Sequence, residues 1–345
     1  MNKQIIDKIE YCYSVNAIEL NGEPWLLFGG EREGILCAYH GKDFREKVMI
    51  LSPEERLGGV MSISTIPDKE GYFFMSTGFY SMVQSETSSI YLVRYKNGQF
   101  QWEKMCDVPY LHRFDVITVE GRRFLIACTL HEGKRDNDDW STPGKVLGAE
   151  LPSDLDKKID IQMTVLAEGL YQNHGFNRIP GTNDVLIASC EGVYRITPPK
   201  KDSTSWNIKQ IFKISVSDVC ALDLDGDGTL EYGIISPFHG NCFRIYRQTP
   251  DGAEILYEHP KPLDFYHAIY ADTLNGTPVF IVGARGMDMD LYQVFWDAKE
   301  EKFCSEIIEA GAGSSNACIV HIAAGDILMS ANRQKPEAEA VIFTN

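Results

Sequence analysis

A short turn between two apolar runs recurs along this chain at nearly regular spacing, and this repeat restricts the fold more than any other feature. Its four clearest copies are Leu20-Asn21-Gly22, Val119-Glu120-Gly121, Leu224-Asp225-Gly226 and Leu274-Asn275-Gly276. The gaps between the glycines correspond to two, two and one repeats of about 50 residues. Asn-Gly or Asp-Gly between apolar runs is a strong signal for a β-hairpin.

Each repeat is predicted to contain four short strands. In the repeat at 266–309, apolar runs occupy 267–273, 279–283, 291–296 and 303–308, and a second clear repeat covers 218–258. Less regular repeats lie near 59–108 and 174–214. Four-stranded repeats of about 40–50 residues are typical of β-propellers. We therefore expect an all-β, seven-bladed propeller of four-stranded blades, with residues 1–345 as a single domain; a β-sandwich with a tail is the alternative.

The last repeat, 316–345, has only three predicted strands, at 317–322, 327–331 and 340–344. The N-terminal segment 4–11 precedes the first full repeat and has no partner in it. We expect this segment to supply the outer strand of the last blade, because that pairing removes an open sheet edge.

Composition disfavours two classes of partner. Lys and Arg total 33 against 49 Asp and Glu, a net charge of −16 that disfavours nucleic acid and anionic membranes. The nine cysteines contain no CxxC pair, the N-terminus has no apolar signal region, and no apolar run is long enough for a membrane span. These features predict reduced thiols in a cytoplasmic protein that is a monomer or a weak homo-oligomer.

Polar residues recur at the predicted start of the first strand in each blade. Nine residues before each turn glycine stand Tyr13, His112, Ser217 and His267, and the next positions include Arg113 and Asp218. The irregular repeats place Asn173-His174 and Ser315-Asn316 at about the same point. In a propeller the start of the first strand lies near the axis, so we expect these side chains at one central opening.

The ends of the second strands should reach the same opening. They carry Glu31-Arg32, His131-Glu132, His239, Arg285 and Asn332-Arg333. Convergent polar groups in a concave site are typical of ligand binding. A long loop after His131 contains Trp140, which could stack on a sugar, and Phe79, Tyr80 and Phe238 are further aromatic candidates.

The segment from Asp223 to Glu231 has carboxylates at its positions 1, 3, 5 and 9, supplied by Asp223, Asp225, Asp227 and Glu231. Alternate carboxylates in a glycine-rich turn can hold a hard cation such as Ca²⁺. Position 12 is Ile234, so the segment is not an EF-hand. An ordinary acidic turn with Asx hydrogen bonds is the alternative. A turn between the first and second strands should face away from the opening, so we expect a structural site.

This acidic turn resembles the FG-GAP or VCBS-type repeat of calcium-binding propellers. That resemblance implies Ca²⁺ ligation by Asp223, Asp225, Asp227, the carbonyl of Thr229 and Glu231. The whole chain more loosely resembles seven-bladed propellers that act on carbohydrates, namely ulvan lyases, rhamnosyl-glucuronate lyases and the propeller of aldos-2-ulose dehydratase. This resemblance implies a lyase or dehydratase that uses His, Tyr and Arg around a central cavity; no catalytic motif is matched residue by residue.

β-Elimination beside a carboxylate or ketone needs a base, an acid and a positive charge that stabilises the enolate-like intermediate. We expect His112 and His267 as base and acid, with His174, His131 and Tyr13 as further candidates. Arg113 and Arg285 could bind a substrate carboxylate. The remaining candidates for substrate binding are Glu31, Glu132, Trp140, Asp218, His239, Asn316 and Arg333.

Three alternatives stay open at this stage. Neutral imidazoles, with Glu132 or Asp218, could instead bind a divalent metal that polarises a sugar carbonyl. A second class is a propeller that binds a sugar or a protein without catalysis, since fold does not imply function. A third is glycoside hydrolysis, which requires paired carboxylates and could use Glu31, Glu132, Asp115 or Asp218. No nucleotide-binding motif is present.

Overall fold

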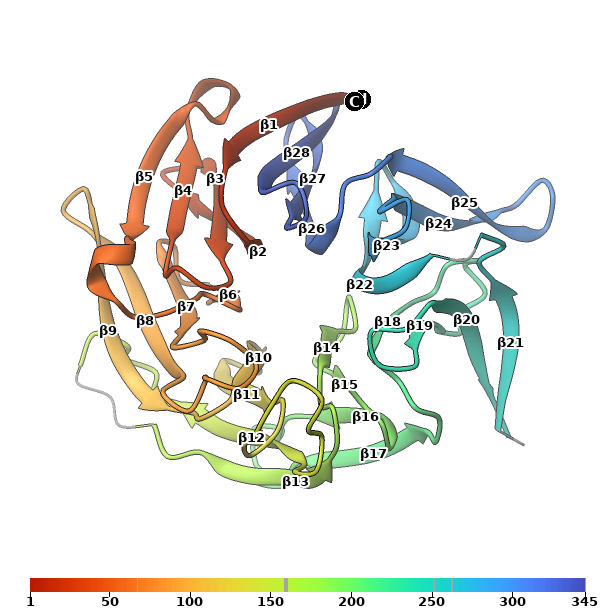
Figure 1. Cartoon of the computed structure of the whole chain (residues 1–345), viewed down its shortest axis with the longest axis horizontal. Helices are drawn as coiled ribbons and strands as arrows, with labels where there is room; N and C mark the ends of the chain where they lie inside the picture. Colours follow the sequence, from red (N-terminus) through yellow and green to blue (C-terminus); the bar gives the residue numbers. More distant parts are fainter. Residues whose placement is uncertain (67, 158–160, 251, 262, 345) are drawn as a thin grey trace. The chain divides into compact units, whose positions relative to one another are not determined.

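The computed structural model describes residues 1–66, 68–157, 161–250, 252–261 and 263–344. Its strands form seven sheets of four strands each, with β1 at the edge of the sheet that contains the last three strands (Figure 1). The fold is therefore the all-β, seven-bladed propeller that the repeats predict, and the N-terminal strand completes the last blade. No helix in these ranges is long and apolar enough to cross a membrane.

The chain divides into two compact units. The three-blade unit comprises residues 8–174 and 197–207. Its first blade contains β2 (Cys12–Leu20), β3 (Glu23–Gly30), β4 (Leu36–His40) and β5 (Glu46–Leu51). Its second contains β6 (Ile63–Thr65), β7 (Tyr72–Thr77), β8 (Ser89–Lys96) and β9 (Gln99–Asp107), and its third β10 (Leu111–Val119), β11 (Arg122–Thr129), β12 (Gly144–Leu151) and β13 (Thr164–Leu170). Two 3₁₀ turns, η1 (Lys42–Phe44) and η2 (Pro53–Glu55), flank β5.

The four-blade unit comprises residues 1–7, 175–196 and 208–345. Its blades are formed by β14 (Gly175–Arg178), β15 (Val185–Ser189), β16 (Gly192–Thr197) and β17 (Asn207–Phe212), and by β18 (Asp218–Leu222), β19 (Glu231–Ser236), β20 (Cys242–Thr249) and β21 (Gly252–Glu258). The next blade contains β22 (Asp264–Leu274), β23 (Thr277–Gly286), β24 (Leu291–Asp297) and β25 (Lys302–Glu309). The last contains β26 (Ser314–Ile322), β27 (Gly325–Asn332), β28 (Glu337–Thr344) and β1 (Asn2–Lys8).

Three of the four turns used to find the repeat are two-residue hairpins. Asn21-Gly22, Glu120-Gly121 and Asn275-Gly276 all have positive φ at both positions. They join β2 to β3, β10 to β11 and β22 to β23. Positive φ at both central residues defines a type I′ turn, whose twist matches that of the paired strands. This explains why the turn motif in the sequence predicted these hairpins correctly.

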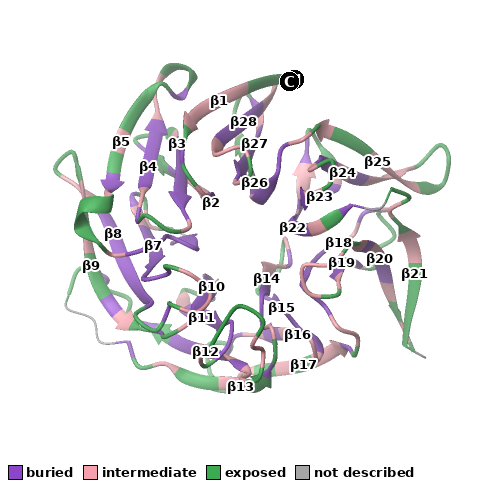
Figure 2. Ribbon diagram, in the orientation of Figure 1, coloured by how far each residue is buried: buried purple, intermediate pink, exposed green. Residues whose placement is uncertain are grey.

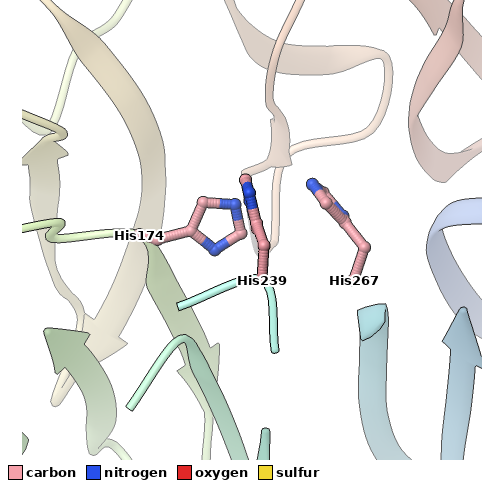
Figure 3. Close-up of side chains that lie close together, drawn as sticks. All are labelled: His174, His239 and His267. Atoms are coloured by element: carbon pink, nitrogen blue, oxygen red, sulfur yellow. The ribbon is translucent and has the colours of Figure 1, made fainter. Parts of the chain in front are cut away.

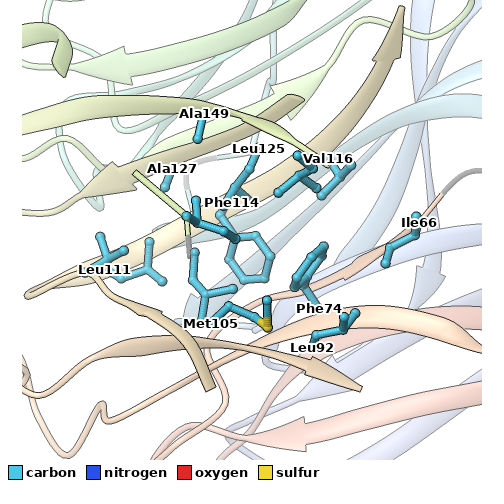
Figure 4. Close-up of a cluster of buried hydrophobic side chains, with 14 of the residues drawn as sticks. Ile66, Phe74, Leu92, Met105, Leu111, Phe114, Val116, Leu125, Ala127 and Ala149 are labelled. Carbon is cyan, nitrogen blue, oxygen red and sulfur yellow. The ribbon is translucent and has the colours of Figure 1, made fainter. Parts of the chain in front are cut away.

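The hydrophobic cores lie between neighbouring blades. One core of the three-blade unit packs Phe74 and Leu92 of the second blade against Phe114, Val116 and Leu125 of the third (Figure 4). Middle strands such as β7 are nearly all buried, whereas outer strands such as β13 and β21 are largely exposed (Figure 2). Burial of the middle strands on both faces explains their continuous apolar runs.

The first strands of consecutive blades contact one another within each unit. β6 lies between β2 and β10 in the three-blade unit, and β14, β18, β22 and β26 contact one another in sequence in the four-blade unit. The beginnings of these strands are therefore neighbours. This arrangement gathers the polar residues that the sequence places at the strand starts.

Candidate functional site

A β-bulge marks the start of the first strand in four blades. The pairing register shifts at Cys12/Ser14, Leu111/Arg113, Tyr266/Ala268 and Ser314/Asn316. The extra residue in each case is Tyr13, His112, His267 and Ser315. Bulges redirect a side chain and are frequent near functional sites. Three of these residues are the ones that stand nine positions before a turn glycine, so the recurring offset in the sequence reflects a recurring bulge.

Each bulge follows a residue with a left-handed backbone. Tyr11, Tyr110, Phe265 and Gly313 stand two residues before the bulged position and have φ between 53° and 67°. Gln172, two residues before His174, has φ of 51°. The same local conformation therefore precedes His174, and this supports the predicted equivalence of His174 with the bulged residues.

His112 is held in one orientation and one tautomer. Its Nδ1 lies 3.2 Å from the carbonyl oxygen of His174, and its Nε2 lies 3.3 Å from the hydroxyl of Tyr13. Because a carbonyl can only accept, Nδ1 carries the proton, and Nε2 is left to accept from the Tyr13 hydroxyl. Tyr13 is 1% exposed and His112 is 3% exposed. The pair is therefore arranged for proton transfer between a phenol and an imidazole.

A cation lies beside this pair. The guanidinium carbon of Arg113 is 5.6 Å from the centre of the Tyr13 ring. The Nε of Arg113 is buried without a hydrogen-bond partner, and no ion pair joins Arg113 to a carboxylate in the described part of the chain. The ring of His174 lies 4.4 Å from that of His112, between centroids. Tyr13, His112, Arg113 and His174 thus form one group in the three-blade unit.

His267 repeats the tautomer of His112 in the four-blade unit. Its Nδ1 lies 2.6 Å from the carbonyl oxygen of Ser315, the bulged residue of the next blade, and His267 is 2% exposed. Its Nε2 is therefore the basic nitrogen. The neighbours differ, because the ring of His239 stacks at 5.3 Å and that of Phe265 lies edge-on at 6.0 Å.

His239 and His267 also belong to a group of imidazoles that could hold a metal ion. Figure 3 shows their rings side by side, each rising from its own backbone segment. His239 follows β19, and its amide donates to the hydroxyl of Ser217 at 3.0 Å. Imidazole nitrogens suit Zn²⁺, Cu²⁺, Fe²⁺ or Ni²⁺ better than Ca²⁺.

The two predicted arginines of the four-blade unit come together. Arg285 lies over the ring of Phe265, 4.4 Å from guanidinium carbon to ring centre. The Oε1 of Gln334 accepts from Arg285 at 3.5 Å and from Arg333 at 3.1 Å. Asn316 directly follows the bulge at Ser315 and is half-buried. Phe265 was not singled out from the sequence, although it stands two residues before His267.

His131, a further candidate base or acid, bonds to the backbone through both ring nitrogens. Its Nε2 donates to the carbonyl of Met82 at 2.8 Å, and its Nδ1 accepts from the amide of Gly133 at 3.0 Å. Both ring nitrogens are thus used by the backbone. Burial lowers the pKa of His131 to about 4, so the ring is neutral. We therefore assign His131 to anchoring the loop that follows it.

Trp140 lies in this loop, and one of its faces is already covered. The ammonium group of Lys134 is 3.3 Å from the centre of the Trp140 ring, and the ring of His131 is 6.1 Å away, edge-on. The face of Trp140 that Lys134 covers is therefore not available to a sugar.

Most of the candidate carboxylates bond to the protein itself. Asp218 accepts from the amide of Val219 at 3.0 Å, and Asp115 accepts from Val116 at 2.8 Å. Glu132 forms an ion pair with Lys145. Glu31 is half-buried at the end of β3, where its amide donates to the carbonyl of Tyr11 at 2.9 Å. These bonds fix strand starts and loops, which makes Asp115, Asp218 and Glu132 poor matches for the paired acids of a hydrolase.

The acidic turn joins β18 to β19. Asp223, Asp225 and Asp227 have carboxylate oxygens close enough to hold a metal ion. The carboxylates also bond within the protein: Asp223 accepts from the amides of Gly226 and Gly228 at 2.8 and 2.9 Å. The guanidinium of Arg247, on β20, contacts Asp225, Asp227 and Glu231. This arginine was not recognised from the sequence.

Comparisons with known proteins support the fold. No protein-family model matches the chain, and no curated protein matches its sequence. The chain is similar to the crystal structure of the extracellular domain of BT4673 from B. thetaiotaomicron, with a TM-score of 0.59 and 12% identity over 100% of this chain and 40% of that one. It is also similar to an ancestral GH74 enzyme, with a TM-score of 0.55 and 12% identity over 96% of this chain and 51% of that one. The chain thus spans about half or less of these structures, and the likeness shows the propeller fold.

Proposed function

We propose that this protein is a carbohydrate-active enzyme that cleaves a small uronate-containing sugar by β-elimination. The observation that carries the proposal is the hydrogen bond between Tyr13 and His112, beside the guanidinium of Arg113. The carbonyl of His174 holds the imidazole in the tautomer that can accept a proton at Nε2. A proton-transfer pair next to a cation matches what elimination beside a carboxylate requires.

In the proposed reaction, Arg113 binds the uronate carboxylate through its forked N–H groups. The phenolic oxygen of Tyr13 takes the proton from the carbon next to that carboxylate while its own hydroxyl proton passes to Nε2 of His112. The electrons of the broken C–H bond form the C=C bond, and the C–O bond to the leaving group breaks. The leaving oxygen takes a proton from Tyr13, and His112 returns its proton to Tyr13, so the step needs no oxidant or reductant.

A metal-assisted form of the reaction is the second candidate, and the stacked imidazoles of His239 and His267 favour it. These two side chains would be ligands through ring nitrogens. A bound divalent ion would supply Lewis-acid stabilisation of the substrate carboxylate.

Two other functions rank lower. A glycoside hydrolase is suggested by the similar GH74 enzyme, but Asp115, Asp218 and Glu132 already bond to the protein. A binding protein without catalysis would use the same polar groups, and the similar BT4673 structure is an extracellular domain assigned to a one component system. In a binding protein, the Tyr13–His112 pair would recognise a ligand without transferring a proton.

The direct test is to incubate the protein with uronate-containing oligosaccharides and measure the ultraviolet absorbance of the unsaturated product. Tyr13→Phe removes the hydroxyl and should lower the rate by about 100-fold or more. Tyr72→Phe is the matched control, because the hydroxyl of Tyr72 bonds to Asp156 at 2.7 Å, away from the proposed pair. Full turnover in Tyr13→Phe would reject the mechanism, and oligosaccharide binding without any product would favour the binding protein.

A further inference from the structure

We propose that the guanidinium of Arg247 is the resident cation of the acidic turn and that the turn keeps its structure without calcium. The sequence of the turn predicts Ca²⁺, since carboxylates alternate from Asp223 to Asp227 and Glu231 follows. A bound Ca²⁺ would need several of these oxygens turned toward one point. The guanidinium of Arg247 supplies a positive charge beside these carboxylates from within the protein.

Arg247 reaches three carboxylates at once. Its Nη2 lies 2.8 Å from Oδ2 of Asp225, its Nη1 lies 3.2 Å from Oδ2 of Asp227, and its Nε lies 3.0 Å from Oε1 of Glu231. The β-ladder fixes this position, because Arg247 on β20 stands directly opposite Glu231 on β19. The guanidinium has a fixed, forked set of N–H donors, and the strand pairing holds these donors opposite the carboxylate of Glu231.

The remaining carboxylate oxygens accept from backbone amides. Both oxygens of Asp223 are bonded to Gly226 and Gly228, as described above, and Oδ1 of Asp225 accepts from the amide of Asp227 at 3.1 Å. Oδ1 of Asp227 accepts from Thr229 at 2.7 Å. Oε2 of Glu231 accepts from Leu224 at 2.8 Å. Every carboxylate oxygen of the four acids therefore has a protein partner, and a calcium ion would share Asp225, Asp227 and Glu231 with the guanidinium, which repels it.

Burial makes this arrangement important for the fold. Glu231 is 0% exposed, and an unpaired buried carboxylate is strongly unfavourable. The acids in turn raise the pKa of Arg247, so its charge is permanent. A fixed internal cation neutralises Glu231 at all times, whereas a calcium ion would do so only where the ion is abundant.

Calcium titration of the wild type and of Arg247→Met tests the proposal. We expect the Tm of the wild type to differ by less than about 1 °C between EDTA and millimolar Ca²⁺, with no heat of binding by calorimetry. Arg247→Met should lower the Tm in EDTA by about 5 °C or more, and added Ca²⁺ should restore part of this loss because the acids are now open to it.

Arg244→Met is the matched control. Arg244 lies on the same strand and pairs with Glu258 at 2.8 Å, away from the turn. This variant should change the Tm little and should gain no calcium dependence. A wild type that Ca²⁺ stabilises by several degrees would overturn the proposal, as would an Arg247→Met variant that behaves like Arg244→Met. The wild-type titration decides the question even if Arg247→Met fails to fold.

Discussion

His112 and His267 occupy the same kind of β-bulge but have different neighbouring side chains. Each is the extra residue of a β-bulge, is buried, and donates from Nδ1 to a carbonyl at the corresponding strand start of the next blade. Nε2 of His112 faces the Tyr13 hydroxyl, whereas His267 lies beside the rings of His239 and Phe265. The repeat thus sets the tautomer, and the neighbouring side chains set the chemistry that each imidazole can perform.

The largest effect should come from replacing each imidazole while keeping its bond to the backbone. Asparagine can place an N–H near the position of Nδ1, so His112→Asn and His267→Asn retain a donor and lose Nε2. We expect His112→Asn to reduce turnover by about 10²–10⁴-fold, the usual contribution of a general acid–base group. Steady-state kinetics on the uronate oligosaccharide measure this loss.

The same two variants separate proton transfer from metal binding. In the metal-assisted form, the wild type should carry a divalent metal in elemental analysis, His267→Asn should reduce its content, and His112→Asn should leave it unchanged. Equal metal content in both variants and the wild type would remove the metal-assisted form. If both variants lose turnover equally and neither variant nor the wild type contains metal, the two histidines have the same role. The neighbouring side chains would then not determine the chemistry of each imidazole.

The sequence predicts part of this site, because residues within one hairpin keep a fixed spacing from its turn. The bulge lies at a constant offset from the type I′ turn, so Tyr13, His112 and His267 could be found from the turn glycines alone. The partners could not be found in this way. The carbonyl of His174 is 62 residues from His112, and Met82 is 49 residues from His131. Such contacts depend on which blades are neighbours. Arg247 has a different limit: it lies in the same blade as the acidic turn, and only the β19–β20 register, which the sequence does not give, places it opposite Glu231.

A second prediction concerns the last blade, which supplies the acceptor of His267. Lys3 on β1 forms ion pairs with Glu309 and with the buried Glu339. Deletion of residues 2–8 removes Lys3 and exposes the edge of β28. We expect a loss of about 3–5 kcal/mol in the free energy of unfolding, the usual result of leaving a buried charge unpaired.

Amide hydrogen exchange of the deletion variant identifies which strands lose stability. Protection in β26–β28, including the strand that carries Ser315, should decrease more than protection in β10 and β11, which carry and support His112. Lys3→Met separates the charge from the strand, since it keeps β1 and removes the ammonium group. A deletion variant as stable as the wild type would show that β1 contributes little to the last blade.

The smallest expected effect distinguishes His112 from His131, the other histidine of the same blade. Burial lowers the pKa of His131 to about 4 in the folded protein, against an ordinary value of 6.5. A depressed pKa means that the folded state resists protonation, so its contribution to stability is full above about pH 6.5 and is lost as the pH falls toward 4. The difference between 6.5 and about 4 corresponds to a loss of about 3 kcal/mol in the free energy of unfolding.

His131→Gln should flatten the fall in stability between pH 6.5 and 4, because glutamine can still donate to Met82 and cannot be protonated. Chemical unfolding at a series of pH values measures the slope. His321→Gln is the control: Asp326 raises the pKa of His321, so its stabilising contribution is present below pH 6.5 and is lost as the pH rises. An unchanged slope in His131→Gln would mean that the pKa of His131 is the same in the folded and unfolded states, and His131 would then return to the list of proton-transfer candidates beside His112.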